Sequence, residues 1–192
     1  CVKRRQARMR YCRKRLDAEV IAESSVGPSG VRFGRAMPVS RIPGFTAGWV
    51  SVQDEAAQRA CFLLDVRDGM RVLDACAAPG GKTGHLLELA DFHLTAIDAD
   101  AARLSRVKEN LDRLGLSAQL ITGDAARPER WWDGRRYDRI LVDVPCTASG
   151  ILRRHPDIRW LRREDDIDKL SRAAQQITGA LWSLLNPDGK LL

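Results

Sequence analysis

Long apolar runs are absent from this 192-residue sequence. No stretch approaches the roughly 18 apolar residues that a membrane-spanning helix requires. The basic N-terminus also lacks the apolar core of a signal peptide. We therefore expect a cytoplasmic protein that has no membrane partner.

Paired cysteines are also missing. The five cysteines are an odd number, lie far apart and include no Cys-x-x-Cys pair. This pattern argues against a disulfide framework and against a zinc site, so we expect reduced thiols and no bound metal.

Two common nucleotide-binding patterns are incomplete in the stretch from Val72 to Thr83. A P-loop requires a glycine where this chain has Cys76, and a dinucleotide fingerprint requires one where it has Ala78. What remains is a strand ending in an acid, a Pro-Gly-Gly turn and the start of a helix. Such a turn presents backbone N–H groups to a polar ligand, and a compact ligand with an adenosine end, such as S-adenosylmethionine, would suit it.

Positive charge is concentrated at the N-terminus. The net charge is +7, and the first fifteen residues carry eight basic side chains and no acid. A segment of this kind favours a polyanion such as RNA. On composition alone, a solvated helix face explains it equally well.

The order of expected elements predicts an α/β fold. We expect a basic helix over residues 1–22, and short strands around Val31, Phe33 and Val39 within a Gly/Pro-rich linker. Residues 46–192 then form the main domain, which follows a basic N-terminal piece and linker over residues 1–45. The main domain alternates strands (71–76, 93–98, 118–122, 137–144 and from 190) with helices, which indicates a parallel sheet. Three helices are expected over 52–64, 82–90 and about 164–185, and a further one, after the second strand, carries Leu104, Val107, Leu111 and Leu114 and is stopped by Gly115. Because the chain starts at Cys1 and ends in an apolar run, we expect it to be a fragment.

Acids stand at the ends of four successive strands: Asp74, Asp98, Asp124 and Asp143. In a parallel sheet these ends share one edge, so the four carboxylates should converge. We expect Asp98 to bind ribose hydroxyls and Asp124 to accept from an adenine amino group. Asp143 could hold an ammonium group or orient the substrate. Asp74 is as well suited to holding loop amides as to contacting a ligand.

A thiol follows the fourth strand, in the loop from Asp143 to Gly150. Cys146 lies where a cleft is expected, and the basic residues after it could lower its pKa. For an isolated cysteine, packing is the usual role.

Three motifs together resemble the Sun/Fmu family of RNA cytosine-5 methyltransferases, most closely its bacterial 16S ribosomal RNA branch. They are Asp74-Ala-Cys-Ala-Ala-Pro-Gly-Gly-Lys-Thr83, Asp143-Val-Pro-Cys-Thr-Ala-Ser-Gly150 and Arg154-His-Pro-Asp-Ile-Arg-Trp160. The segment from Gly48 to Gln58 is similar to the same family's lead-in. The resemblance extends from about Pro43 to the end.

The resemblance implies a Rossmann-like class I S-adenosylmethionine-dependent methyltransferase sheet, incomplete at its C-terminus, in a protein expected to be a monomer. The implied cofactor-binding residues are Cys76, Ala77, Ala78, Pro79, Gly80, Gly81, Lys82, Asp98, Asp124 and Asp143. Those expected to bind ribosomal RNA are Arg4, Arg5, Arg8, Arg153, Arg154 and Arg159.

The family uses two thiols. One, on a Thr-Cys motif after the fifth strand, attacks C6 of cytosine, and the other, matching Cys146, assists product release. The Thr-Cys motif is expected beyond Leu192, so we expect this fragment alone to be inactive. Attack by Cys146, as in DNA cytosine-5 methyltransferases, is the less favoured alternative.

Other functions remain open. The chain could be an inactive module that binds RNA and S-adenosylmethionine. A nucleotide-dependent oxidoreductase is disfavoured by the missing Gly-x-Gly-x-x-Gly, and a small-molecule methyltransferase by the basic segment and the Pro-Cys loop.

Overall fold

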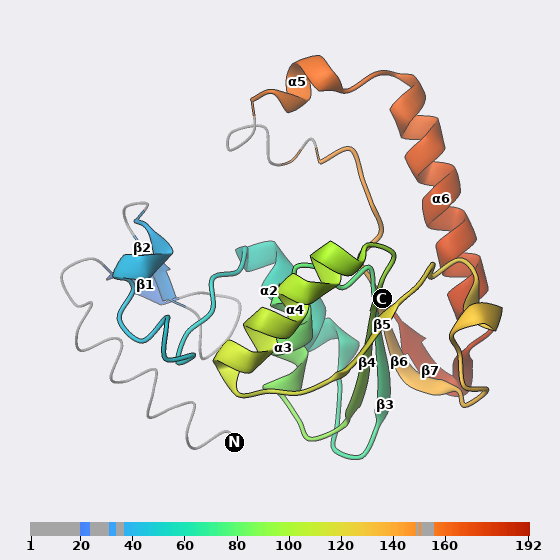
Figure 1. Cartoon of the computed structure of the whole chain (residues 1–192), viewed down its shortest axis with the longest axis horizontal. Helices are drawn as coiled ribbons and strands as arrows, with labels where there is room; N and C mark the ends of the chain where they lie inside the picture. The colour runs from blue at the N-terminus through green and yellow to red at the C-terminus, as the bar shows by residue number, and fades with distance from the viewer. Residues whose placement is uncertain (1–19, 24–30, 34–36, 149, 151–155) are drawn as a thin grey trace.

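The centre of the protein is a five-stranded parallel sheet in the order β5-β4-β3-β6-β7 (Figure 1). The computed structural model describes residues 20–23, 31–33, 37–148, 150 and 156–192. The strands are β3 (Arg71–Ala75), β4 (His93–Asp98), β5 (Gln119–Thr122), β6 (Tyr137–Val142) and β7 (Leu185–Leu191). Strand order reverses beside β3, because β4 lies on one side of it and β6 on the other. Open α/β sheets bind ligands at such a switch point, at the carboxyl ends of the strands.

Helices cover both faces of the sheet. On one face lie α2 (Glu55–Leu64), α3 (Gly81–Leu87) and α4 (Ala101–Leu114), and on the other lies α6 (Asp165–Trp182). Strand side chains alternate between the faces. Val72 accordingly packs with Leu64 and Leu86, whereas its neighbour Leu73 packs with Leu181. The predicted α/β sheet is thus confirmed.

Local sequence signals set the helix ends. Asp54 and Asp100 are N-cap residues whose carboxylates accept hydrogen bonds from the first-turn N–H groups of α2 and α4. Gly115 ends α4 in the left-handed conformation, at φ +68°.

The prediction of a helix over residues 1–22 is wrong at the C-terminal end of that range. Residues Val20–Glu23 form β1, which pairs antiparallel with β2 (Val31–Phe33). Consecutive β-branched residues, Val20 and Ile21, favour extended backbone over helix. Residues 1–19 lie outside the described part, so the basic helix stays a prediction there, as does the boundary at residues 45 and 46.

Other differences are smaller. Val39 begins the 3₁₀ turn η1 (Val39–Arg41) rather than a strand, because the N–H of Arg41 bonds back to Pro38. The turn η2 (Pro128–Arg130) and the short helix α5 (Ile158–Leu161) were not expected. Strand β7 begins at Leu185, five residues earlier than expected. Its Asn186–Gly189 stretch is a bulge between the pairs Tyr137–Leu185 and Arg139–Lys190.

The segment that leads into the domain packs on α4. The Arg113 guanidinium donates to the carbonyls of Phe45 and Val50, at 2.7 and 3.0 Å. It also lies 4.2 Å from the Phe45 ring centroid. Gly48 has φ +70°, and a Cβ there would lie 1.9 Å from the Arg113 carbonyl oxygen. Only glycine fits this approach.

Gly48→Ala should therefore lower the free energy of unfolding by about 3 kcal/mol, combining left-handed strain with the backbone clash. Gly69→Ala is the matched control, because Gly69 has φ +80° but nothing within 4 Å of its Cβ position. It should cost only the strain, about 1–2 kcal/mol. Urea unfolding measures both values, and equal losses would contradict the close approach.

Candidate cofactor site

The turn between β3 and α3 forms the floor of the site. It is tied to the sheet by the N–H of Ala77, which donates to the Ile97 carbonyl at 3.0 Å. It closes through the N–H of Gly80, which donates to Ala77 at 2.8 Å. Gly80 has φ +93°, and a Cβ there would lie 3.1 Å from the Cα of Val107. The turn is thus pressed against α4, and Gly80 allows that contact.

Asp98 at the end of β4 holds this turn from the side. Its buried carboxylate accepts from the N–H of Ala78 at 3.2 Å and from the N–H of Asp100 at 3.1 Å. The Arg103 guanidinium donates to the Ala78 carbonyl at 3.2 Å and lies 3.7 Å from Asp98. The predicted ribose ligand therefore also fixes the loop beside it.

A cavity of about 180 Å³ opens above the turn. Lys82 and Asp143 form an ion pair at its wall, with Nζ 2.6 Å from the carboxylate. The lining residues are Val52, Gln53, Ala57, Asp74, Cys76, Ala77, Ala78, Pro79, Gly81, Lys82 and Asp143. Most of the predicted cofactor residues thus meet around one cavity.

Asp124 and Asp98 are not among the residues that line the cavity. Asp124 is exposed, accepts from the N–H of Ala126 at 2.9 Å and lies 3.5 Å from Arg127. It lies just past β5, one strand beyond Asp98, whose carbonyl accepts from the N–H of Gly123. Its adenine-binding role stays a prediction.

Asp74 is buried at the end of β3, with 1% of its surface exposed. One carboxylate oxygen accepts from the Thr83 hydroxyl at 2.7 Å. Burial raises the pKa of Asp74 to about 7, although the Thr83 hydrogen bond and nearby Lys82 favour the charged form. The acids Asp143 and Asp98 raise the pKa further.

This raised pKa predicts a pH-dependent stability. The unfolded carboxyl titrates near 3.8 and the folded one near 7, so the folded chain holds the extra proton between these values. The contribution of Asp74 to stability is full below pH 4 and is lost as the pH rises through 7. Relative to Asp74→Asn, the wild-type free energy of unfolding should fall by at most about 4 kcal/mol across this window. Urea titrations at pH 5, 6, 7 and 8 measure the difference, and a constant difference would contradict the assignment.

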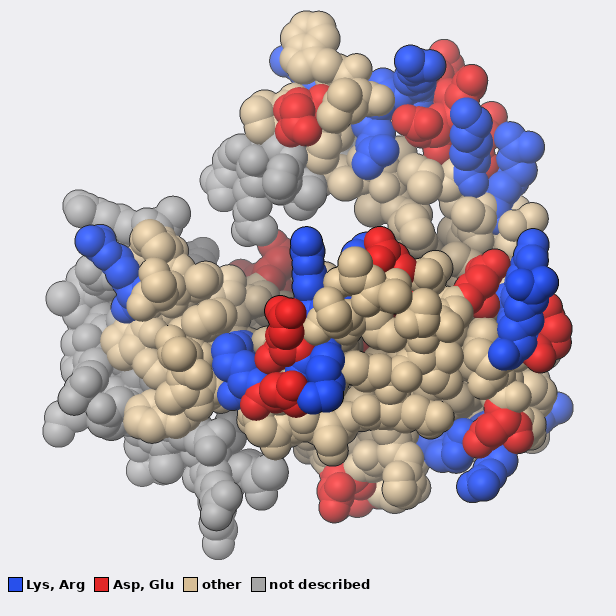
Figure 2. Space-filling view, viewed as in Figure 1, with Lys and Arg blue, Asp and Glu red and all other residues tan. Residues whose placement is uncertain are grey.

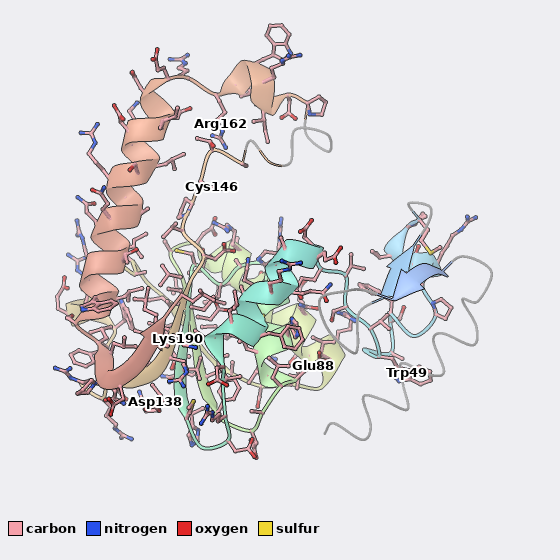
Figure 3. The ribbon with its side chains drawn as sticks, turned by 180° about the vertical axis from the view of Figure 1, so that it is seen from behind. Trp49, Glu88, Asp138, Cys146, Arg162 and Lys190 are labelled. Atoms are coloured by element: carbon pink, nitrogen blue, oxygen red, sulfur yellow. The ribbon has the colours of Figure 1, made fainter. Side chains whose placement is uncertain are left out.

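The three cysteines that the structure describes differ in environment. Cys61 is fully buried. Burial raises the pKa of Cys76 to about 11, and Asp98, Asp143 and Asp74 raise it further. That thiol is therefore a poor source of thiolate. Cys146 is exposed, on the segment that rises from the sheet toward α5 (Figure 3).

The loop that carries Cys146 is hydrogen-bonded to the segment after α5. The Arg162 guanidinium, just past α5, donates to the Thr147 carbonyl at 2.9 Å. Arg159 is exposed on α5 itself. The other predicted RNA-binding residues, Arg4, Arg5, Arg8, Arg153 and Arg154, lie outside the described residues.

Gln53 and Thr83 were missed as site residues. Gln53 lines the cavity, and its side-chain oxygen lies 3.0 Å from His85 Nδ1 on α3. The only sequence signal for Gln53 was its position in the Gly48–Gln58 lead-in. No group of three or more potential metal-ligating side chains occurs among the described residues. Within the same part of the chain, no helix is long and apolar enough to cross a membrane.

The site fits S-adenosylmethionine in the chemistry of its donors and acceptors. The site offers three kinds of group: backbone N–H groups of a turn at the start of a helix, a buried carboxylate beside that turn, and a Lys–Asp pair. Together they suit the hydroxyls of an adenosine and a charged amino-acid group. The sequence profile described as "16S rRNA methyltransferase RsmB/F" matches residues 61–192. The chain belongs to this family. S-adenosylmethionine is the cofactor of these methyltransferases, so the predicted family, cofactor and Rossmann-like class I fold are confirmed.

Relatives of the family support the assignment over most of the chain. Ribosomal RNA small subunit methyltransferase B of Vibrio cholerae is 54% identical over 80% of this chain and 36% of its own length. The Pseudomonas putida protein of the same name is 50% identical over 90% of this chain and 42% of its own length. The chain therefore spans about two fifths of the curated relatives that it matches.

Solved structures of similar proteins share the fold of this chain. A methyltransferase homolog from Pyrococcus horikoshii has a TM-score of 0.80 and 29% identity, covering 95% of this chain and 59% of the homolog. NSun6 from the same organism, crystallised with SFG, has a TM-score of 0.74 and 27% identity over 87% of this chain and 44% of its own.

Proposed function

We propose that the chain is the cofactor-binding core of an enzyme that methylates C5 of a cytosine in RNA, with 16S ribosomal RNA as the substrate. The observation that carries this proposal is the cavity at the switch point of the sheet, in a chain of a ribosomal RNA methyltransferase family. Residues 46–192 form the methyltransferase domain, and residues 1–45 are the tail of an RNA-binding region.

The cofactor supplies the methyl group when bound, and the chain's residues position it. The Cys76–Lys82 turn offers backbone N–H groups, Asp98 accepts from the ribose hydroxyls and Asp124 from the adenine amino group. Asp98 can do this because its hydrogen bond to Ala78 keeps its carboxylate against the turn.

The attacking thiol is none of the described cysteines. Cys61 is buried, and burial with three neighbouring acids suppresses ionisation of Cys76. Cys146, the exposed thiol, acts in product release. The thiol that attacks C6 of cytosine is expected after Leu192, so the 192-residue piece binds the cofactor but does not turn over.

RNA approaches from the side of α5 and α6. Helix α5 and the N-terminal part of α6 extend away from the sheet, and a gap separates this arm from the body (Figures 1 and 2). Basic and acidic side chains both occur along the arm in Figure 2. A target base must leave its stack to be methylated, which costs least in single-stranded RNA. If the basic residues neutralise Z phosphates, the logarithm of the association constant for single-stranded RNA should fall linearly with the logarithm of the salt concentration, at a slope of about −0.7Z.

A product analysis tests the proposal. A protein extended beyond Leu192 is incubated with methyl-labelled S-adenosylmethionine and 16S ribosomal RNA, and the labelled nucleoside is identified. We expect 5-methylcytidine. Label on another atom would overturn the proposal, and cofactor and RNA binding without label would favour an inactive binding module.

A further inference from the structure

Trp160 is the most exposed of the large apolar side chains that the structure describes. It lies on α5, where 84% of its surface is exposed, and its neighbour Leu161 is 67% exposed. Among the described residues, no aromatic pair or cation–π contact involves Trp160. A single exposed apolar residue is ordinary on a protein surface, so the surroundings of Trp160 decide what its ring can bind.

Those surroundings are basic. The α5 segment, defined as residues 156–163, carries three arginines against one acid: Arg159, Arg162, Arg163 and Asp157. The three arginines are exposed, as Trp160 is. The first turn of α6, which follows, is acidic. Positive charge around an open aromatic ring is the combination that binds single-stranded nucleic acid, because the cations attract phosphates and the ring stacks on a base.

A hydrogen bond holds the α5 segment beside the loop of Cys146. The Nε–H group of Arg162 donates to the Thr147 carbonyl at 2.9 Å, and Figure 3 shows Arg162 directed toward the chain that carries Cys146. An RNA strand with its cytidine near Cys146 would therefore pass the α5 segment. Residues two apart on a helix point about 200° apart, so Trp160 faces away from this loop. A base on Trp160 is then a neighbour of the target cytidine.

We propose that Trp160 is a stacking platform for one unpaired nucleobase of the substrate RNA that flanks the target cytidine, with Arg159 on a nearby phosphate. This inference rests on the proposed function and adds a contact to the face of a base. Every base has such a face, so the contact favours no sequence. It requires an unpaired base, because paired bases stay stacked within their helix. Trp160 should thus favour single-stranded over double-stranded RNA.

The experiment measures binding of the 192-residue chain to two RNA probes by fluorescence anisotropy. One probe is a short, labelled, cytidine-containing single strand, and the other is the same strand annealed to its complement. Trp160→Ala should lower the affinity for the single strand roughly 5- to 100-fold, the loss that one stacked base predicts. The affinity for the duplex should stay within about twofold.

Three further variants separate stacking from other effects. Trp160→Phe keeps an aromatic face and should retain most of the affinity. Trp182→Ala is the matched control, because Trp182 is 63% exposed but lies at the opposite end of α6 from α5. It should leave both affinities unchanged. Arg159→Ala should make the salt dependence shallower by about 0.7 in slope, whereas Trp160→Ala should leave the slope unchanged, because stacking releases no counterions.

The outcomes are distinct. Wild-type affinity for the single strand in Trp160→Ala overturns the inference and leaves the proposed function in place. If that variant also lowers the free energy of unfolding of a protein extended beyond Leu192, further protein chain covers Trp160 instead of RNA. Equal losses for single strand and duplex, or equal losses in the alanine and phenylalanine variants, overturn the inference as well. If the wild type binds neither probe, the inference and the RNA substrate of the proposed function both fall.

Discussion

Replacing Asp98 by alanine is expected to lower the affinity of the chain for S-adenosylmethionine by about 100-fold or more. Two effects combine. In the proposed site the ribose hydroxyls would lose a charged acceptor, and each such hydrogen bond is worth about 1.5–3 kcal/mol. The N–H of Ala78 also loses the carboxylate that holds the β3–α3 turn. Equilibrium dialysis with labelled cofactor measures the change.

Asp100 provides the matched control in the same loop. It is exposed, and its carboxylate caps α4 by accepting from Ala102 and Arg103. Asp100→Ala should cost about 1 kcal/mol of stability and leave cofactor affinity within about twofold. Asp124→Ala should fall between the two, because Asp124 is exposed and already bonded to Ala126. Unchanged affinity in Asp98→Ala would remove Asp98 from the cofactor site.

Replacing Cys146 by alanine is expected to trap a covalent protein–RNA adduct in a protein extended beyond Leu192. Cys146 is the exposed thiol of the described part and lies three residues past the cavity residue Asp143. If it assists release, its loss leaves attack on C6 intact and blocks the later step. Turnover should fall about 100-fold, in the range of general acid–base contributions. The adduct is measured as a slow band on a denaturing gel.

Cys76→Ala is the comparison for this variant, because it also removes a thiol close to the cavity. The raised pKa of the wild-type Cys76 thiol keeps that thiol unreactive, so replacing it should cause no adduct to accumulate. If Cys146→Ala instead abolishes adduct formation, Cys146 is the attacking residue, and the division of labour between two thiols is wrong.

The sheet and its ligand edge could be predicted because their signals are local. Apolar runs that end in Asp74, Asp98 and Asp143 identify strand ends, and parallel pairing places those ends together. The turn at Gly80 could be predicted for the same reason, since its glycines follow the end of a strand and precede a helix.

Features that depend on distant contacts could not be predicted. The Gln53 side chain at the cavity contacts His85, which lies 32 residues further along the chain. The spacing of apolar residues in the sequence gives no sign of such a contact. The bulge in β7 depends on its register with β6. The strand at Val20–Glu23 was not predicted, because the basic residues before it suggested a helix that continued through this segment.

The most direct test uses the 192-residue chain with methyl-labelled S-adenosylmethionine and 16S ribosomal RNA, measuring label bound to the protein and label transferred to RNA. We expect one cofactor bound per chain and no methyl transfer above the protein-free blank. Transfer of label to the RNA would contradict the assignment of the attacking thiol to residues beyond Leu192, and absence of binding would contradict the cofactor site itself.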